Sequence, residues 1–151
     1  KLLAMAPHSR IDLGAGREFV VVPGPIRDLP TTQWGYVTGD RVLYTGDGFA
    51  FLHRGEHLPD AELTTHLPGE CVMLSSEMLV PPNVEASTFV VKTAFAWAYF
   101  SSSEPILTEV DELLRAYPPA FICPGHGNVI DDVPSILPVV RETLRGAETL
   151  V

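Results

Sequence analysis

The sequence predicts an α/β fold, because short apolar runs typical of strands fill its first third and helical patterns then alternate with one further strand. The early strands are expected at Phe19–Val22, Gln33–Thr38 and Val42–Thr45. Gly39-Asp40 separates the last two of these runs, which is a hairpin signal. The further strand is expected at Ala120–Cys123, directly before a proline and a glycine.

Three helices are expected in the second half of the chain. Glu85–Phe100 has apolar residues on more than one face and no proline, which predicts a largely covered helix. Ser103 is placed to cap a second helix that ends before Pro118-Pro119. A last helix is expected over Pro138–Leu150, whereas residues 1–18 are expected to be an irregular lead-in to a domain over residues 19–151.

Length and charge exclude several classes of protein. The chain has 151 residues, about one domain, and its net charge is −9. A net negative charge of this size argues against a nucleic-acid partner, because a protein that binds nucleic acid needs a concentrated positive face. The longest apolar run, Thr93–Phe100, is far shorter than a membrane span. Cys71 and Cys123 are isolated, with neither metal nor disulfide spacing, which favours a reducing compartment, so a cytoplasmic protein is expected. A small-molecule substrate is expected, with no nucleic acid and no membrane as partner.

Two strands each deliver a polar side chain into a turn rich in glycine. Val42–Thr45 runs into Gly46-Asp47-Gly48, and Ala120–Cys123 runs into Pro124-Gly125-His126-Gly127. A turn aspartate bonded to its own backbone, and a loop histidine without a role, are the structural alternatives for each residue alone. Together, Asp47 and His126 form the mixed oxygen and nitrogen set that zinc, iron or manganese prefers.

At these residues the chain resembles the metallo-β-lactamase superfamily. Leu43-Tyr44-Thr45-Gly46-Asp47 is similar to the motif whose aspartate bridges two metal ions. Pro124-Gly125-His126-Gly127 is similar to the last metal motif, whose histidine completes the second metal site. The resemblance implies the later half of an αββα sandwich, with a mixed sheet and covering helices. It also implies two divalent metal ions, with zinc expected first and iron or manganese as alternatives.

A third ligand position is implied by the flavodiiron branch of the superfamily. Its pattern His-Trp-Pro-Asp-Ser-Met-x-x-Tyr can be laid on Asp28–Tyr36, which puts Asp28 in the place of the histidine. A carboxylate there favours harder ions such as iron or manganese, while the neighbouring Arg27 opposes cation binding. His53 and His57 also have the spacing of a zinc pair, but Gly55 and Pro59 make a helix unexpected there.

The superfamily signature His-x-His-x-Asp-His has no counterpart in residues 1–24. The resemblance therefore covers only the second half of the family fold, and the first half is expected from an N-terminal segment or from a homo-oligomer partner. The resemblance implies metal-dependent hydrolysis by a metal-activated water, with Asp47 in the catalytic centre. A flavodiiron-like di-iron oxidoreductase and a non-catalytic domain with an incomplete site are the alternatives.

Overall fold

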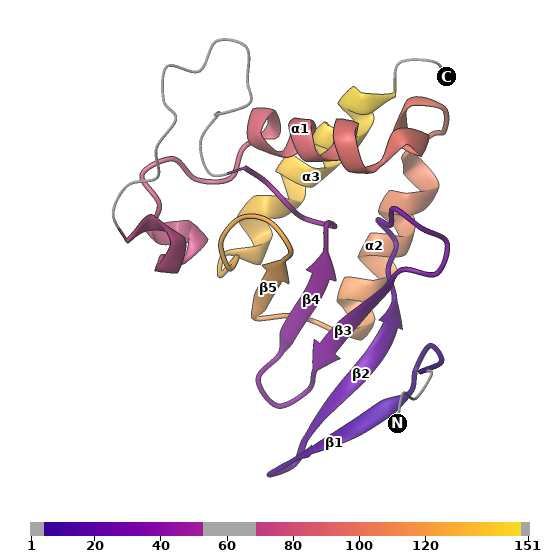
Figure 1. Ribbon diagram of the computed structural model, residues 1–151, viewed down its shortest axis with the longest axis vertical. Coiled ribbons are helices and arrows are strands. Elements are labelled where there is room, and N and C mark those ends of the chain that lie inside the picture. The colour runs from indigo at the N-terminus through magenta and orange to yellow at the C-terminus, as the bar shows by residue number, and fades with distance from the viewer. Residues whose placement is uncertain (1–4, 53–68, 149–151) are drawn as a thin grey trace.

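A computed structural model describes residues 5–52 and 69–148 of the chain. One mixed five-stranded sheet has the order β1-β2-β3-β4-β5, in which β1 to β4 are antiparallel neighbours and β5 runs parallel to β4 (Figure 1). The strands are β1 (Arg10–Gly14), β2 (Arg17–Pro23), β3 (Gln33–Val37), β4 (Val42–Gly46) and β5 (Phe121–Pro124). The helices are α1 (Val84–Ala94), α2 (Glu104–Ala116) and α3 (Val133–Ala147), with short 3₁₀ helices η1 (Glu70–Val72), η2 (Ser75–Glu77) and η3 (Ala96–Tyr99).

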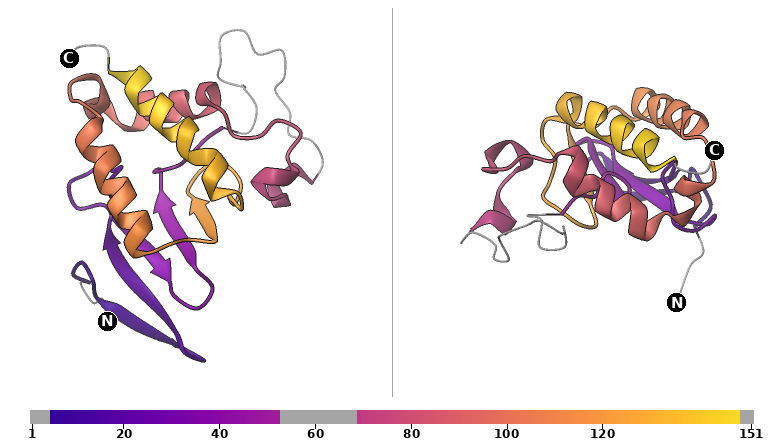
Figure 2. Two further views of the ribbon diagram at one scale, coloured as in Figure 1. Left: turned by 180° about the vertical axis from the view of Figure 1, so that it is seen from behind. Right: turned by 90° about the horizontal axis from the view of Figure 1, so that it is seen from above.

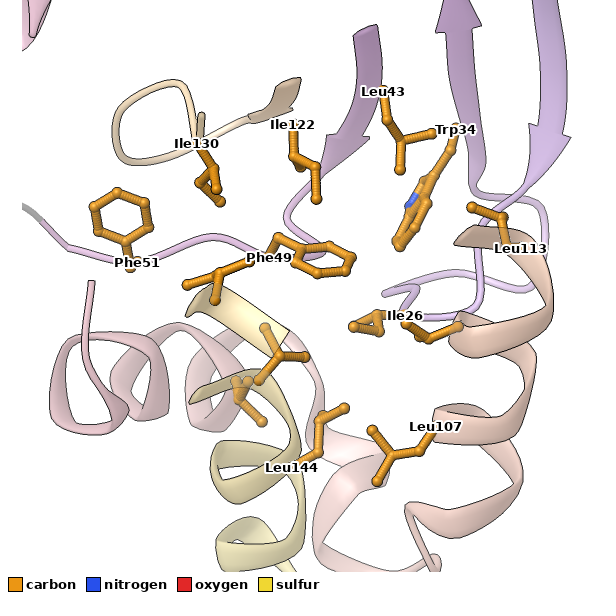
Figure 3. Close-up of a cluster of buried hydrophobic side chains, with 14 of the residues drawn as sticks. Ile26, Trp34, Leu43, Phe49, Phe51, Leu107, Leu113, Ile122, Ile130 and Leu144 are labelled. Atoms are coloured by element: carbon orange, nitrogen blue, oxygen red, sulfur yellow. The ribbon is translucent and has the colours of Figure 1, made fainter. Parts of the chain in front are cut away.

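Helices α2 and α3 lie on one face of the sheet (Figure 2). Seen from behind, α2 and α3 lie in front of the strands, while α1 crosses the far end of the sheet beside α3 (Figure 2). On the covered face, one residue from each of four strands pairs with its neighbour on the next strand, and the resulting row lies in the apolar core. Helices α2 and α3 pack on the other side of this core (Figure 3). The row consists of Val20, Tyr36, Leu43 and Ile122.

The opposite face of the sheet is also apolar, and no helix in the described part of the chain covers it. Phe19 lies across Gly35 on this face, where an added Cβ would come within 2.2 Å of the Phe19 ring. The ring centroids of Phe19 and Tyr44 are 6.5 Å apart. Tyr44 in the inner strand β4 is 46% exposed, which is unusual for a large side chain at such a position, and Phe121 in the edge strand β5 is 37% exposed. We call this surface the open face.

The strands at the centre of the sheet agree with the sequence prediction. Phe19–Val22, Gln33–Thr38, Val42–Thr45 and Ala120–Cys123 each fall on an observed strand with ends shifted by a residue or two. The hairpin at Gly39-Asp40 is confirmed, with Arg41 in the left-handed region at φ 55°. The mixed sheet with covering helices is likewise confirmed.

Three segments of the chain differ from the prediction. Residues 10–14, expected to be irregular, form the edge strand β1, which pairs with β2 across the Gly14–Gly16 turn. The expected helix over residues 85–100 ends at Ala94, because Phe95 leaves the helical region (φ −119°, ψ 68°) and η3 follows. Helix α3 begins at Val133, before the expected Pro138, because the Asp132 carboxylate accepts a hydrogen bond from the Ser135 amide.

Candidate metal centre

Asp47 is held at the end of β4 by the two glycines that flank it. Gly46 has φ 53°, a left-handed conformation that suits glycine, and it ends the strand. Gly48 lies against the indole of Trp34, where an added Cβ would be 2.3 Å from Cζ2. The Gly48 amide donates to the Thr45 carbonyl at 3.0 Å, which closes a tight turn around Asp47.

His126 is held in the same way at the end of β5. The Gly125 amide donates to the Gly46 carbonyl at 2.6 Å, so the turns that follow the two parallel strands are tied together. Gly127 has φ 94° and lies against Phe51, where an added Cβ would be 2.7 Å from the ring. The Phe51 amide donates to the His126 carbonyl at 3.3 Å, which fixes the far side of the turn.

The two side chains meet at this edge of the sheet. His126 Nε2 lies 3.6 Å from Asp47 Oδ1, although the two residues are 79 positions apart in the chain. The His126 side chain is 66% exposed and that of Asp47 is 36% exposed, so both are open to an ion or to a further ligand. Their expected proximity is confirmed, and metal binding by them stays a prediction.

Asp28 lies in a different setting. Its Oδ1 accepts hydrogen bonds from the Thr32 hydroxyl at 2.6 Å and from the Leu29 amide at 2.9 Å. The Thr32 bond above all lowers the pKa of the Asp28 carboxyl below its ordinary value. The residue lines an open depression together with Leu29 and Trp97.

The described ranges, 5–52 and 69–148, contain no group of three or more histidine, cysteine, aspartate or glutamate side chains arranged to hold an ion. The structure thus brings Asp47 and His126 together and leaves Asp28 outside the pair, so its role as a ligand stays a prediction. The proposed zinc pair His53 and His57 lies outside the described residues.

The loop after β5 is supported by contacts that the sequence did not reveal. Asn128 Nδ2 donates to the Glu70 carbonyl at 2.7 Å and to the Met73 carbonyl at 2.8 Å. The Asp131 carboxylate accepts hydrogen bonds from the Ser75 hydroxyl and from the amide and hydroxyl of Ser76, at 2.6–3.0 Å. These bonds attach the segment 70–77 to the loop that carries His126.

A small pocket lies next to Asp47, between α1 and α3, and Ser87 and Thr143 are among the residues that line it. The hydroxyls of Ser87 and Thr143 are buried without a hydrogen-bond partner in the described part of the chain, and sequence reasoning missed both residues. The only sequence signal for these two residues is a polar side chain on an otherwise apolar helix face. The pocket itself could not be predicted, because it forms only where α1 packs on α3.

Comparison with known proteins agrees with this geometry. No family model matches the chain. An anaerobic nitric oxide reductase flavorubredoxin from Shigella dysenteriae is 33% identical over 72 residues, which cover 47% of this chain and 15% of that protein. The chain therefore spans less than a fifth of this relative's length.

Two solved structures share the fold over nearly the whole chain. The rubredoxin:oxygen oxidoreductase of Desulfovibrio gigas has a TM-score of 0.62 at 17% identity, covering 96% of this chain and 31% of that one. The flavodiiron protein of Giardia intestinalis has a TM-score of 0.63 at 15% identity, covering 95% and 31%. The fold is therefore that of a metallo-β-lactamase-like domain. Within that class, the chain is related to the flavodiiron proteins.

These relatives overturn the expected zinc hydrolase. The expectation of a hydrolase rests on the large number of hydrolytic members in the superfamily, and no residue of this chain requires hydrolysis. The sequence relatives are named as reductases, one similar structure is named as an oxidoreductase, and several others are named as flavodiiron proteins. The flavodiiron register at Asp28–Tyr36 points to the same branch as these similar proteins. No helix in the described part of the chain has the length and apolar character needed to cross a membrane.

Proposed function

We propose that this chain is the second half of a flavodiiron-like domain that reduces a small oxidant, such as nitric oxide or dioxygen, at a centre of two iron ions. The observation that carries the proposal is the meeting of Asp47 and His126 at the ends of two parallel strands. This pair stands on a fold that flavodiiron structures share, and a nitric oxide reductase is a sequence relative. Both oxidants accept electrons, so a separate reductant completes the reaction.

The donor atoms of the pair fit iron. A carboxylate supplies two oxygens that can bind two neighbouring cations, and a neutral imidazole supplies one nitrogen. Asp47 would hold the ions through its carboxylate, and His126 would bind through Nε2, the atom that faces the carboxylate. When bound, the iron ions would supply the electron transfer to the oxidant. The tight turns around both residues keep the two donors in place, which lowers the cost of ordering them.

The pair alone is an incomplete site, and the open face indicates where the remainder belongs. We infer that a second sheet layer packs on the open face and brings the remaining ligands, as the αββα resemblance implies. The exposed rings of Tyr44 and Phe121 give this face the apolar character of an interface. This layer comes from a segment of the same polypeptide or from a second copy.

Iron content and oxidant consumption test the proposal, measured on the complete protein that contains this chain. Asp47→Asn and His126→Asn should each lower the iron content severalfold and abolish reductant-dependent consumption of nitric oxide or dioxygen. His8→Asn is the matched control, because His8 is exposed and its φ of 66° is one that asparagine tolerates. A protein that holds no iron, or that loses none in the Asp47 and His126 variants, would contradict the proposal.

A non-catalytic domain is the second candidate, and one observation favours it. Among the described residues only two metal-competent side chains meet at the site. If the domain is non-catalytic, the complete protein consumes neither nitric oxide nor dioxygen, whatever its iron content. A charged substitution on the open face, such as Tyr44→Lys, should still disrupt the assembly of the protein.

A further inference from the structure

Strand β1 forms the border of the sheet, and its outer edge has no partner strand among the described residues (Figure 1). Every residue of Arg10–Gly14 is exposed. Ile11 and Leu13 are 44% and 47% exposed, although both side chains are large and apolar. An edge strand of this kind offers a row of free backbone N–H and C=O groups to a further strand.

The free backbone groups belong to Arg10 and Asp12. Asp12 lies opposite Glu18 of β2, whose carbonyl accepts a hydrogen bond from the Thr38 amide on the β3 side at 2.9 Å. Asp12 and Glu18 are therefore a non-hydrogen-bonded pair of the antiparallel ladder, in which the backbone groups of the two residues point away from each other. Arg10 is two positions before Asp12 and points its amide and carbonyl to the same free side.

The side chains of Asp12 and Glu18 place two like charges directly opposite each other, which is destabilising. Arg10 forms an ion pair with Glu18 at 2.5 Å. In residues 5–52 and 69–148 no cation pairs with Asp12, whose carboxylate accepts a hydrogen bond from the Gly14 amide at 2.7 Å. The outer edge of β1 thus combines free backbone groups with an acid that lacks a cation.

We propose that the outer edge of β1 pairs with the same edge of a second copy of this chain, antiparallel and centred on Ile11. In this register Arg10 of each copy lies opposite Asp12 of the other, which supplies the missing cation at both ends of the contact. Both of these pairs exchange backbone hydrogen bonds, and the two Ile11 side chains meet at the centre. The contact extends the sheet from edge to edge, so it depends neither on the proposed function nor on what covers the open face.

The pattern of charge on β1 favours this partner. An edge strand can be protected from association by lysine residues, which repel each other in any self-pairing. Arg10 and Asp12 have opposite signs, so an antiparallel pair centred between them is attractive. A parallel pair in register would place Arg10 against Arg10 and Asp12 against Asp12, which is repulsive.

Two charge reversals in the complete protein that contains this chain test the pairing. Arg10→Asp leaves two acids on the edge, and Asp12→Arg leaves two bases. Each variant should therefore associate with itself at least about tenfold more weakly than the original protein, because symmetry places each change at two contacts. Mixed one to one, the two variants place acids opposite bases at both positions and should recover most of the original affinity. Sedimentation velocity at several concentrations measures all of these states.

Asp40→Arg is the matched control, because Asp40 is an exposed acid that pairs with Arg17 of β2 at 3.4 Å and lies outside β1. It should leave association unchanged. Recovery in the mixture would also show that both reversed variants fold. Equal association of all the proteins, or a mixture that associates no better than its two components, would overturn the proposal.

Amide hydrogen exchange tests the backbone part of the contact. The amides of Arg10 and Asp12 should exchange more slowly in the associated protein than in the two reversed variants, whereas the Ile11 amide, which faces β2, should be protected in all of them. Equal protection of the Arg10 and Asp12 positions in the variants would show that another segment of the polypeptide occupies the edge. Fast exchange of these amides in the original protein at every concentration would show an unpaired edge. Either result would overturn the proposal.

Discussion

The indole of Trp34 lies so close to Gly48 that the residue after Asp47 has no room for a side chain. A Cβ on Gly48 would be 2.3 Å from Cζ2 of Trp34, and Trp34 itself is 2% exposed. Gly48→Ala should therefore lower the free energy of unfolding by about 1–3 kcal/mol, the usual cost of overpacking a core. Denaturant unfolding measures this change.

Gly146→Ala is the matched control for this substitution. Gly146 lies in α3, and a Cβ added there would have nothing within 4 Å, so alanine should raise stability by about 0.5–1 kcal/mol. Equal effects of the two substitutions would contradict the packing argument.

Asp131 is expected to stabilise the loop of His126 in a manner that depends on pH. Partial burial raises the pKa of the Asp131 carboxyl, but the hydrogen bonds from Ser76 and Ser75 outweigh it and hold the pKa below the ordinary 3.8. Asp131→Ala should lower the free energy of unfolding by about 1–2 kcal/mol at neutral pH. Because the folded pKa is the lower one, the difference between the two proteins should be full above about pH 5 and disappear as pH falls through the folded pKa.

Asp40→Ala is the control for Asp131. Asp40 pairs with Arg17 at 3.4 Å on the surface, and such pairs contribute less than about 1 kcal/mol. Urea unfolding at several pH values would contradict the prediction if the Asp131→Ala deficit grew toward acid pH.

Asp28→Ala tests the third ligand position. If Asp28 binds iron, this variant should hold less iron than the original complete protein, because a charged donor is lost. Thr32→Val removes the 2.6 Å hydrogen bond that restrains the carboxylate, and also the 3.3 Å bond that the Thr32 hydroxyl accepts from the Leu29 amide. It keeps the charged donor and should leave the iron content unchanged or higher. Equal iron in all three proteins, measured by elemental analysis, would limit the role of Asp28 to its turn.

The open face should make the isolated chain associate with itself. Tyr44→Lys puts a charge at its centre and should reduce the apparent mass in light scattering, with little loss of stability because Tyr44 is 46% exposed. Phe100→Lys changes an equally large exposed ring outside the sheet, 69% exposed, and should leave association unchanged. The same mass for the original chain and both variants would argue against the open face as an interface.

The sequence predicted the strands well because each is a short apolar run bounded by glycine or proline. It missed β1 because every residue of Arg10–Gly14 is exposed, so that no burial pattern marks the strand. It placed the start of α3 too late because Pro138 usually ends a helix. Here the lost hydrogen bond is offset by the buried face of Ile136, Val140 and Leu144.

The candidate site was predicted in part for a related reason. Asp47 and His126 stand at strand ends, where glycine marks the turns, so local sequence was enough to select them. The hydroxyls of Ser87 and Thr143 depend on how α1 packs on α3, and the bonds of Asp131 depend on a segment more than fifty positions away. Such relationships are set by tertiary packing and leave no periodic pattern in the chain.

The parallel pairing of β4 with β5 also has a kinetic consequence. Val42 pairs with Phe121, so the long intervening stretch must be brought back on itself before these strands can form their hydrogen bonds. Closing so long a loop is entropically costly and slows folding. The Asp47–His126 pair can therefore exist only after this closure. An ion that binds the pair would bind only the folded domain and would stabilise it by mass action. Metal capture by both residues would then report the completion of folding.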